Sequence, residues 1–90
     1  REILAIEADD DQSLVHLKTR VLRVRRSLAN WDQLLSAEQF VRVHRSWIIN
    51  LEATVTIEPV GGGRMNAHLP GGLTAPVSRS GAQALRARSS

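Results

Sequence analysis

Apolar and polar residues alternate along most of the chain, and this alternation predicts a series of β-strands. In the first part, apolar stretches at 3–7 and 13–19 flank a polar run at 8–12, and a third alternating stretch follows at 20–26. Further strand-like stretches cover 40–44, 47–51, 53–58, 65–69 and 73–77. Successive side chains of a strand point to opposite faces, so alternation predicts strands with one face in a core. The stretch 47–51 is apolar almost throughout, which predicts a strand buried on both sides.

Two stretches have a helical pattern instead. Ser27 precedes four apolar residues at helical spacing, which predicts a short helix capped by Ser27. Its expected packed face comprises Leu28, Trp31, Leu34 and Leu35. Residues 81–88 have the composition of a second helix. Glycine-rich turns at 61–63 and 71–72 join the last three strands into a meander. Pro76 predicts either that the last strand lies at a sheet edge or that the strand ends there. The fold class is therefore mainly β, with one or two short helices.

Composition restricts the class of protein without deciding its function. Ninety residues, 42% of them hydrophobic, form one small domain with a single core. The absence of cysteine excludes disulfides, thiolate zinc sites and cysteine nucleophiles. No apolar run reaches the roughly 18 residues needed to span a bilayer.

Positive charge is concentrated after the first fifth of the chain. Residues 1–19 carry five acids and two bases, a net −3, whereas residues 20–90 carry ten bases and four acids, a net +6. Eleven of the twelve bases are arginine, whose planar fork pairs with phosphate and with guanine edges. A high-GC genome also favours arginine codons, so composition alone leaves nucleic-acid binding open.

Two arginines, Arg45 and Arg79, lie in short polar breaks between strongly apolar stretches. Such a break is held in place by its neighbours while the guanidinium stays outside. An arginine in this position can fork onto guanine O6 and N7 or clamp a phosphate. An ordinary solvated arginine has the same spacing, and spacing alone leaves both interpretations open.

Three segments, taken together and in this order, resemble the LytTR DNA-binding domain family. They are residues 6–8 (IEA), 40–50 (FVRVHRSWIIN) and 76–80 (PVSRS). The middle segment is the most specific, because its eleven positions fit the family pattern F-x-R-x-H-R-S-aromatic-aliphatic-aliphatic-N. The resemblance implies an elongated antiparallel β fold of small sheets that reads double-stranded DNA with loops inserted in major grooves. It also implies the output domain of a bacterial transcriptional regulator, commonly a two-component response regulator, that binds promoter direct repeats and forms a homodimer in the intact protein.

The resemblance implies that DNA contacts come from three loops. The expected contact residues are Gln12, Ser13, Arg42, His44, Arg45, Ser46, Ser78, Arg79 and Ser80. For several of them a structural role is the alternative. The serines can cap turns or the final helix, His44 can bond its own loop, and Arg42, like Arg23 and Arg25, can be part of a solvated strand face.

The chain departs from the family pattern in three places. The first loop carries Asp9, Asp10 and Asp11, which either accept from a cytosine amino group or repel phosphate and keep the loop off the backbone. The hairpin near 18–20 is short and lacks a glycine. The family's opening strand is missing before Arg1, so we expect residues 1–90 to be a trimmed carboxy-terminal domain without its regulatory domain. We expect it in the cytoplasm, either free or tethered to a membrane through the missing region.

Other functions are disfavoured. The aspartates lack the glycine and glutamate of a calcium loop, since Leu14 and Arg20 occupy those positions, and the histidines are scattered. No nucleophile elbow or other catalytic motif is present, so we expect no enzyme activity, cofactor, metal or small-molecule substrate. The remaining alternative is a protein-interaction module that uses a basic β face or an edge strand.

Overall fold

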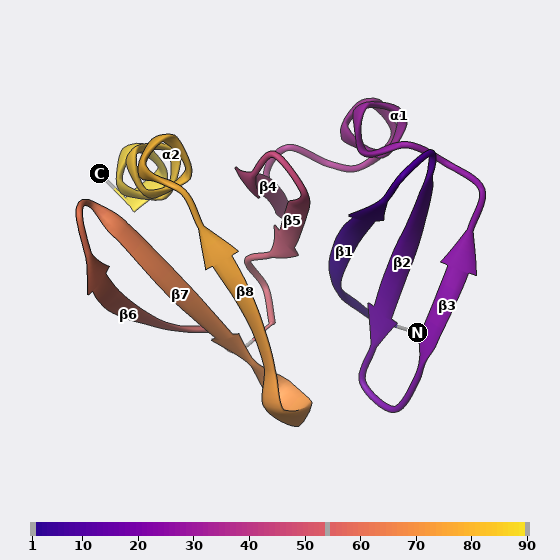
Figure 1. Ribbon diagram of the computed structural model, residues 1–90, viewed down its shortest axis with the longest axis horizontal. Helices are drawn as coiled ribbons and strands as arrows, with labels where there is room; N and C mark the ends of the chain where they lie inside the picture. Colours follow the sequence, from indigo (N-terminus) through magenta and orange to yellow (C-terminus); the bar gives the residue numbers. More distant parts are fainter. Residues whose placement is uncertain (1, 54, 90) are drawn as a thin grey trace.

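The computed structural model describes residues 2–53 and 55–89 and contains two β-sheets and two α-helices (Figure 1). In chain order the elements are β1 (Ile3–Asp9), β2 (Gln12–Leu17), β3 (Val21–Val24), α1 (Leu28–Leu34), β4 (Phe40–His44), β5 (Trp47–Asn50), β6 (Thr56–Gly61), β7 (Arg64–Leu69), the 3-10 turn η1 (Pro70–Gly72), β8 (Leu73–Val77) and α2 (Arg79–Ser89). The domain measures 32 × 25 × 23 Å. None of the described helices is long and apolar enough to cross a membrane.

Every strand pairing in the two sheets is antiparallel. The larger sheet has the order β3-β2-β1-β5-β4, and the smaller is the meander β6-β7-β8. The predicted fold class is therefore confirmed, as is the position of Pro76 in an edge strand.

The larger sheet is covered on both faces, so the described residues form two core clusters, and the prediction of a single core was wrong. On one face Leu28 of α1 packs with Ile48 and other sheet residues. On the other face Ile49 packs with residues of the three-stranded sheet and of α2. Ile48 and Ile49 are adjacent, point to opposite faces and are both 0% exposed. This confirms that β5 is buried on both sides.

The end of α1 differs from the sequence prediction. Leu28 is buried, and Trp31 and Leu35 pack against the same core, but Leu34 is 60% exposed. A helix turns by about 100° per residue, so position i+6 lies about 120° away from position i. The prediction of Leu34 as a packed residue was wrong for this reason, whereas the Ser27 cap is present: its hydroxyl accepts from the N–H of Asn30 at 3.2 Å.

Other element boundaries also differ. The predicted strand 20–26 is restricted to β3, an edge strand on which Val21 is 51% and Leu22 39% exposed. The predicted loop 8–12 shrinks to the turn 10–11, since β1 continues through Asp9. In the predicted strand 53–58, Ala53 is buried but precedes the strand, Thr54 lies outside the described residues, and β6 begins at Thr56.

Helix α2 begins two residues earlier than predicted because Ser78 caps it. The Ser78 hydroxyl accepts from the N–H of Gly81 at 3.1 Å. Gly81 itself lies against β4: a Cβ at this position would be 1.9 Å from the carbonyl oxygen of Val43. The glycine therefore allows the start of α2 to dock directly on the end of β4.

Candidate nucleic-acid interface

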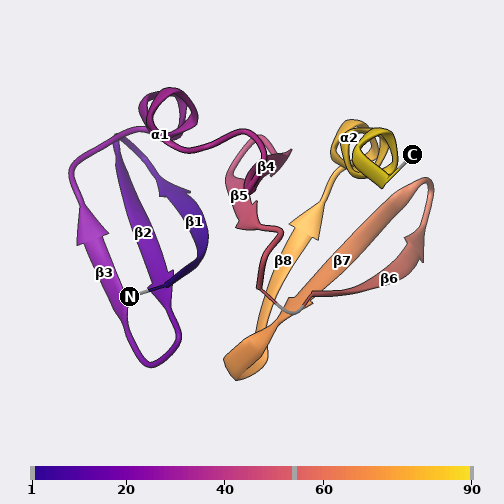
Figure 2. The same ribbon diagram turned by 180° about the vertical axis from the view of Figure 1, so that it is seen from behind.

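Three segments expected to contact DNA lie side by side at one edge of the domain. The N–H of Ala8 donates to the carbonyl of Ser46 at 2.8 Å, and the N–H of Ser78 donates to the carbonyl of Val43 at 2.9 Å. These bonds join the turn 10–11, the turn 45–46 and the segment 78–80 into one edge, which we call the rim. Both views show this edge along the top of the domain (Figure 1, Figure 2).

Arg45 is at the tip of the turn between β4 and β5. Its side chain is exposed, and within residues 2–53 and 55–89 its guanidinium makes no hydrogen bond or ion pair. The residues that anchor the turn are buried, with Val43 0% and Trp47 8% exposed. An unpaired guanidinium is thus presented by a firmly held turn.

The side chain of Arg42 stabilises the turn 45–46. Its Nη2 donates to the carbonyl oxygen of Arg45 at 2.8 Å, and its Nε donates to that of His44 at 3.3 Å. Its Nη1 lies 3.6 Å from a carboxylate oxygen of Asp32 in α1. The guanidinium of Arg42 is therefore used within the domain, a role that differs from both the DNA contact and the solvated strand face considered from the sequence.

His44 and Ser46 stabilise the same turn. The N–H of Ser46 donates to Nδ1 of His44 at 3.1 Å. Because Nδ1 accepts this bond, the hydrogen of a neutral His44 imidazole is on Nε2, which can donate to a ligand. The Ser46 carbonyl is occupied by Ala8, and no hydrogen bond to its hydroxyl occurs among the described residues.

Arg79 lies across the β6–β7 turn. Its Nε donates to the carbonyl oxygen of Gly62 at 3.0 Å, and a Cβ on Gly63 would be 2.9 Å from its Cγ. The absence of a side chain at Gly63 therefore makes room for Arg79. This contact leaves the terminal nitrogens of the Arg79 guanidinium for other partners and brings the β6–β7 turn to the rim.

The serines on either side of Arg79 differ in availability. Ser78 donates to the carbonyl oxygen of Val43 at 3.2 Å while it caps α2, so its hydroxyl is occupied. Ser80 is exposed, and its hydroxyl lies 3.2 Å from that of Ser78. Of these serines, Ser78 caps the final helix.

The chain matches the model of the LytTr DNA-binding domain over residues 1–90. It belongs to the LytTR DNA-binding domain family. Its structure is also similar to the LytTr DNA-binding domain of a Bacillus cereus protein described as a methyl-accepting/DNA response regulator. The TM-score is 0.87 at 28% sequence identity, and the match covers 96% of this chain and 79% of the other. No curated protein matches the chain.

The family and the structural relative confirm the resemblance seen in the sequence, and with it a DNA-binding domain of a transcriptional regulator. The largest departure of this LytTR domain from the sequence expectation is at Ser13, in the strand β2 that follows the first turn. Ser13 is 0% exposed, and its hydroxyl accepts from Nε1 of Trp31 at 2.8 Å and lies 3.4 Å from the Val24 carbonyl. Burial and these bonds leave no place for a nucleotide, so the expectation of a DNA contact at Ser13 does not fit the structure.

Charges in the first turn are partly compensated. Arg23 forms an ion pair with Asp9 and donates to Oε1 of Gln12 at 3.4 Å. Asp10, with a positive φ of 57°, and Asp11 are exposed at the tip. The LytTR rim is therefore acidic at this end and basic near Arg45 and Arg79.

Arg64 is a rim residue that the sequence reasoning did not select. It follows the Gly62-Gly63 turn and is exposed beside the segment that carries Arg79. Its proximity depends on the contact between residues 62 and 79, which are far apart in the chain, and no local pattern predicts that contact. Within the part of the chain that the structure describes, no three His, Cys, Asp or Glu side chains are grouped to hold a metal ion.

Proposed function

We propose that this LytTR domain recognises specific double-stranded DNA through the rim, with the turn 45–46 and the segment 78–80 inserted in major grooves. The observation that carries the proposal is the unpaired guanidinium of Arg45 on a turn whose carbonyls are held by Arg42. A side chain presented on a fixed turn loses little conformational freedom on binding.

Arg45 and Arg79 are the proposed reading residues. Each can donate two parallel hydrogen bonds to guanine O6 and N7, or to a phosphate. The stem of Arg79 is already fixed on the β6–β7 turn. The two arginines lie on segments that flank Val43, whose carbonyl oxygen accepts from Ser78. We therefore expect the two arginines to contact neighbouring positions on the duplex.

The other exposed polar groups of the rim are proposed to bind the DNA backbone. They are Nε2 of His44, the hydroxyls of Ser46 and Ser80, the side chain of Gln12, and Arg64. Arg42 and Ser78 act indirectly, because their polar atoms hold the turn and cap the helix. Asp10 and Asp11 repel phosphates, which limits how the acidic end of the rim approaches the duplex.

A homodimer of the intact regulator on promoter direct repeats is the proposed mode of operator binding. Two domains on one face of the duplex require half-sites separated by about one helical turn, roughly 10 base pairs. Selection of bound duplexes from a random pool tests this arrangement, and enrichment of only a single half-site would oppose it.

Direct binding measurements with the selected duplex test the rim itself. Arg45→Ala and Arg79→Ala are compared with Arg20→Ala, a variant of an exposed arginine in the hairpin between β2 and β3, and this hairpin lies at the end of the larger sheet away from the rim (Figure 1). We expect a loss of affinity only in the first two variants.

The alternative of a protein-interaction module has one structural feature in its favour. The edge strand β3 has an unpaired side, and Val21 and Leu22 are exposed on it. Binding to random duplex DNA at low salt separates the two functions, since phosphate contacts give affinity for any sequence. A domain without such affinity would favour the interaction module.

A further inference from the structure

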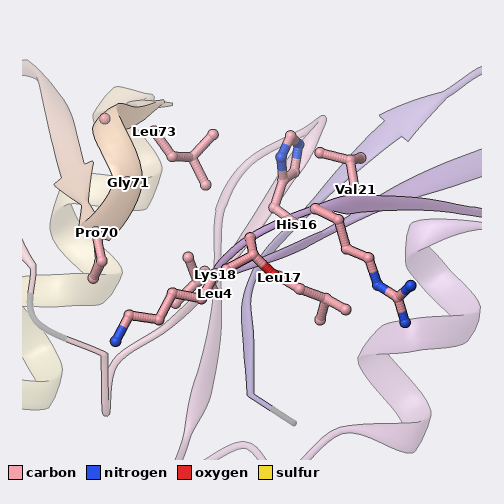
Figure 3. Close-up of a pocket in the computed structure, with 11 residues that line it drawn as sticks. Leu4, His16, Leu17, Lys18, Val21, Pro70, Gly71 and Leu73 are labelled. Carbon is pink, nitrogen blue, oxygen red and sulfur yellow. The ribbon is translucent and has the colours of Figure 1, made fainter.

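A pocket of about 350 Å³ lies at the end of the domain opposite the rim. It is formed between the β2–β3 hairpin and the turn that leads into β8 (Figure 3). Its apolar wall consists of Leu4, Leu17, Val21, Pro70 and Leu73, and its polar groups come from His16, Lys18 and Arg20. Ligand pockets in proteins have volumes of about 300–1,000 Å³, so this one suits a small ligand.

The pocket exists because the smaller sheet does not cover the outer strands of the larger one. Val21 of β3 pairs with His16 of β2, and both side chains lie on the face toward the smaller sheet. Gly71, with φ +80°, closes one side: a Cβ at this position would be 3.5 Å from the carbonyl oxygen of Lys18. The pocket thus has a backbone boundary and two opposed walls.

The polar groups of the pocket are suited to an anion. Lys18 and Arg20 are exposed, and neither forms an ion pair with any residue in 2–53 or 55–89. Glu2 and Glu52 lie near Lys18 in a neighbouring hollow, beyond the distance of an ion pair. The closest acidic group on the His16 side, Glu7, is engaged with Nε2 of His16 at 3.0 Å. A carboxylate would therefore be attracted by two exposed cations at the edge of the pocket, neither of which forms an ion pair within the described residues.

We propose that this pocket binds a small organic carboxylate with an apolar body. The body packs against Leu4, Val21 and Leu73, and the positive charges of Lys18 and Arg20 at the edge of the pocket attract the carboxylate. Burial of the apolar part supplies affinity, while the charge pairing selects an acid over its neutral analogue. The proposal concerns the end remote from the rim and does not depend on DNA binding.

The pocket is connected to the rim by one pair of rings. The imidazole of His16 stacks on the indole of Trp47, with centroids 5.4 Å apart and an angle of 17° between the planes. Trp47 is the first residue of β5 and directly follows the turn 45–46. A ligand against His16 therefore changes the surroundings of Trp47, which provides a spectroscopic reporter.

The two tryptophans allow a test with an internal control. Trp31 packs with α1 on the opposite face of the larger sheet, and its Nε1–H is bonded to Ser13. We expect titration with cyclohexanecarboxylate to shift the indole N–H signal of Trp47 in NMR spectra and to leave that of Trp31 unchanged. Cyclohexanecarboxamide has the same shape without the charge and should bind more weakly by about tenfold, as expected for the loss of a charge-assisted contact.

Adjacent residues of β3 provide matched variants. Val21→Glu places a negative charge in the pocket, whereas Leu22→Glu places the same charge on the opposite face of the strand. Both positions are exposed, so folding should be preserved. Val21→Glu should abolish the Trp47 shift and Leu22→Glu should retain it. No Trp47 shift at millimolar carboxylate, equal binding of acid and amide, or equal effects of the two variants would overturn the proposal.

Discussion

Arg42 donates from Nη2 to the carbonyl oxygen of Arg45 at 2.8 Å, so one arginine of the interface fixes the turn that presents another. Asp32 of α1 lies 3.6 Å from the same guanidinium and extends the connection to the helix. The two arginines thus have different roles: Arg42 stabilises the turn, and the side chain of Arg45 is exposed to solvent.

Arg42→Ala should therefore differ in its salt dependence from Arg64→Ala, which removes an arginine proposed to bind the DNA backbone. Loss of a phosphate-contacting arginine lowers the slope of log affinity against log salt by about 0.9, whereas loss of a positioning residue leaves the slope unchanged. We expect Arg42→Ala to weaken binding to the selected operator by roughly 1 kcal/mol through the two lost hydrogen bonds, with an unchanged slope. Fluorescence anisotropy at several salt concentrations measures both quantities. A slope reduced by about one contact in Arg42→Ala would show that Arg42 touches phosphate directly.

Gly63→Ala should disturb Arg79, and Gly62→Ala is its matched control. Both glycines have a positive φ, 78° and 64°, so alanine should cost each variant about 1–2 kcal/mol of folding stability. Only at Gly63 would the added Cβ clash with Arg79, at 2.9 Å, whereas the nearest contact at Gly62 is 3.9 Å away. We predict similar thermal destabilisation of both variants and reduced DNA affinity in Gly63→Ala alone. Equal affinities would mean that the position of Arg79 on the turn is unimportant.

Ser13 and Ser46 should separate stability from binding. Ser13→Ala removes the buried acceptor of the Trp31 indole N–H, which should lower the free energy of unfolding by about 1–3 kcal/mol. DNA affinity of the folded variant should remain at the wild-type value. Ser46→Ala should have the reverse effect, with normal stability and weaker DNA binding. Urea unfolding measures the stability, and fluorescence anisotropy at urea concentrations below the unfolding transition measures the DNA affinity. Weaker DNA binding of Ser13→Ala without a loss of stability would show that Ser13 contacts DNA.

Local patterns predicted the elements of the fold well, because alternation and helical spacing depend on neighbouring residues. The strand pair around Arg45, the double-sided burial of β5 and the glycine hairpin all have such signals. Leu34 was placed wrongly because position i+6 lies about 120° from position i on a helix. The strand β3 was predicted too long because alternation continues to residue 26, whereas the pairing with β2 extends only from Val21 to Val24.

The sequence predicted the residues of the candidate site less completely than the elements of the fold. The assignments of Arg45 and Arg79 followed from the resemblance and from their polar breaks. The occupied hydroxyl of Ser13, the clamp formed by Arg42 and the position of Arg64 beside α2 depend on contacts between distant segments. Hydrogen-bond partners across a fold have no signature in the local order of residues.

The most direct test of the rim is the affinity of the wild-type domain and three variants for a selected operator, measured under identical salt. Arg45→Ala and Arg79→Ala should each cost roughly 1–3 kcal/mol and relax the preference for one base position, while Arg20→Ala should bind like the wild type. Unchanged affinity and specificity in both rim variants would contradict the proposal that these arginines read DNA.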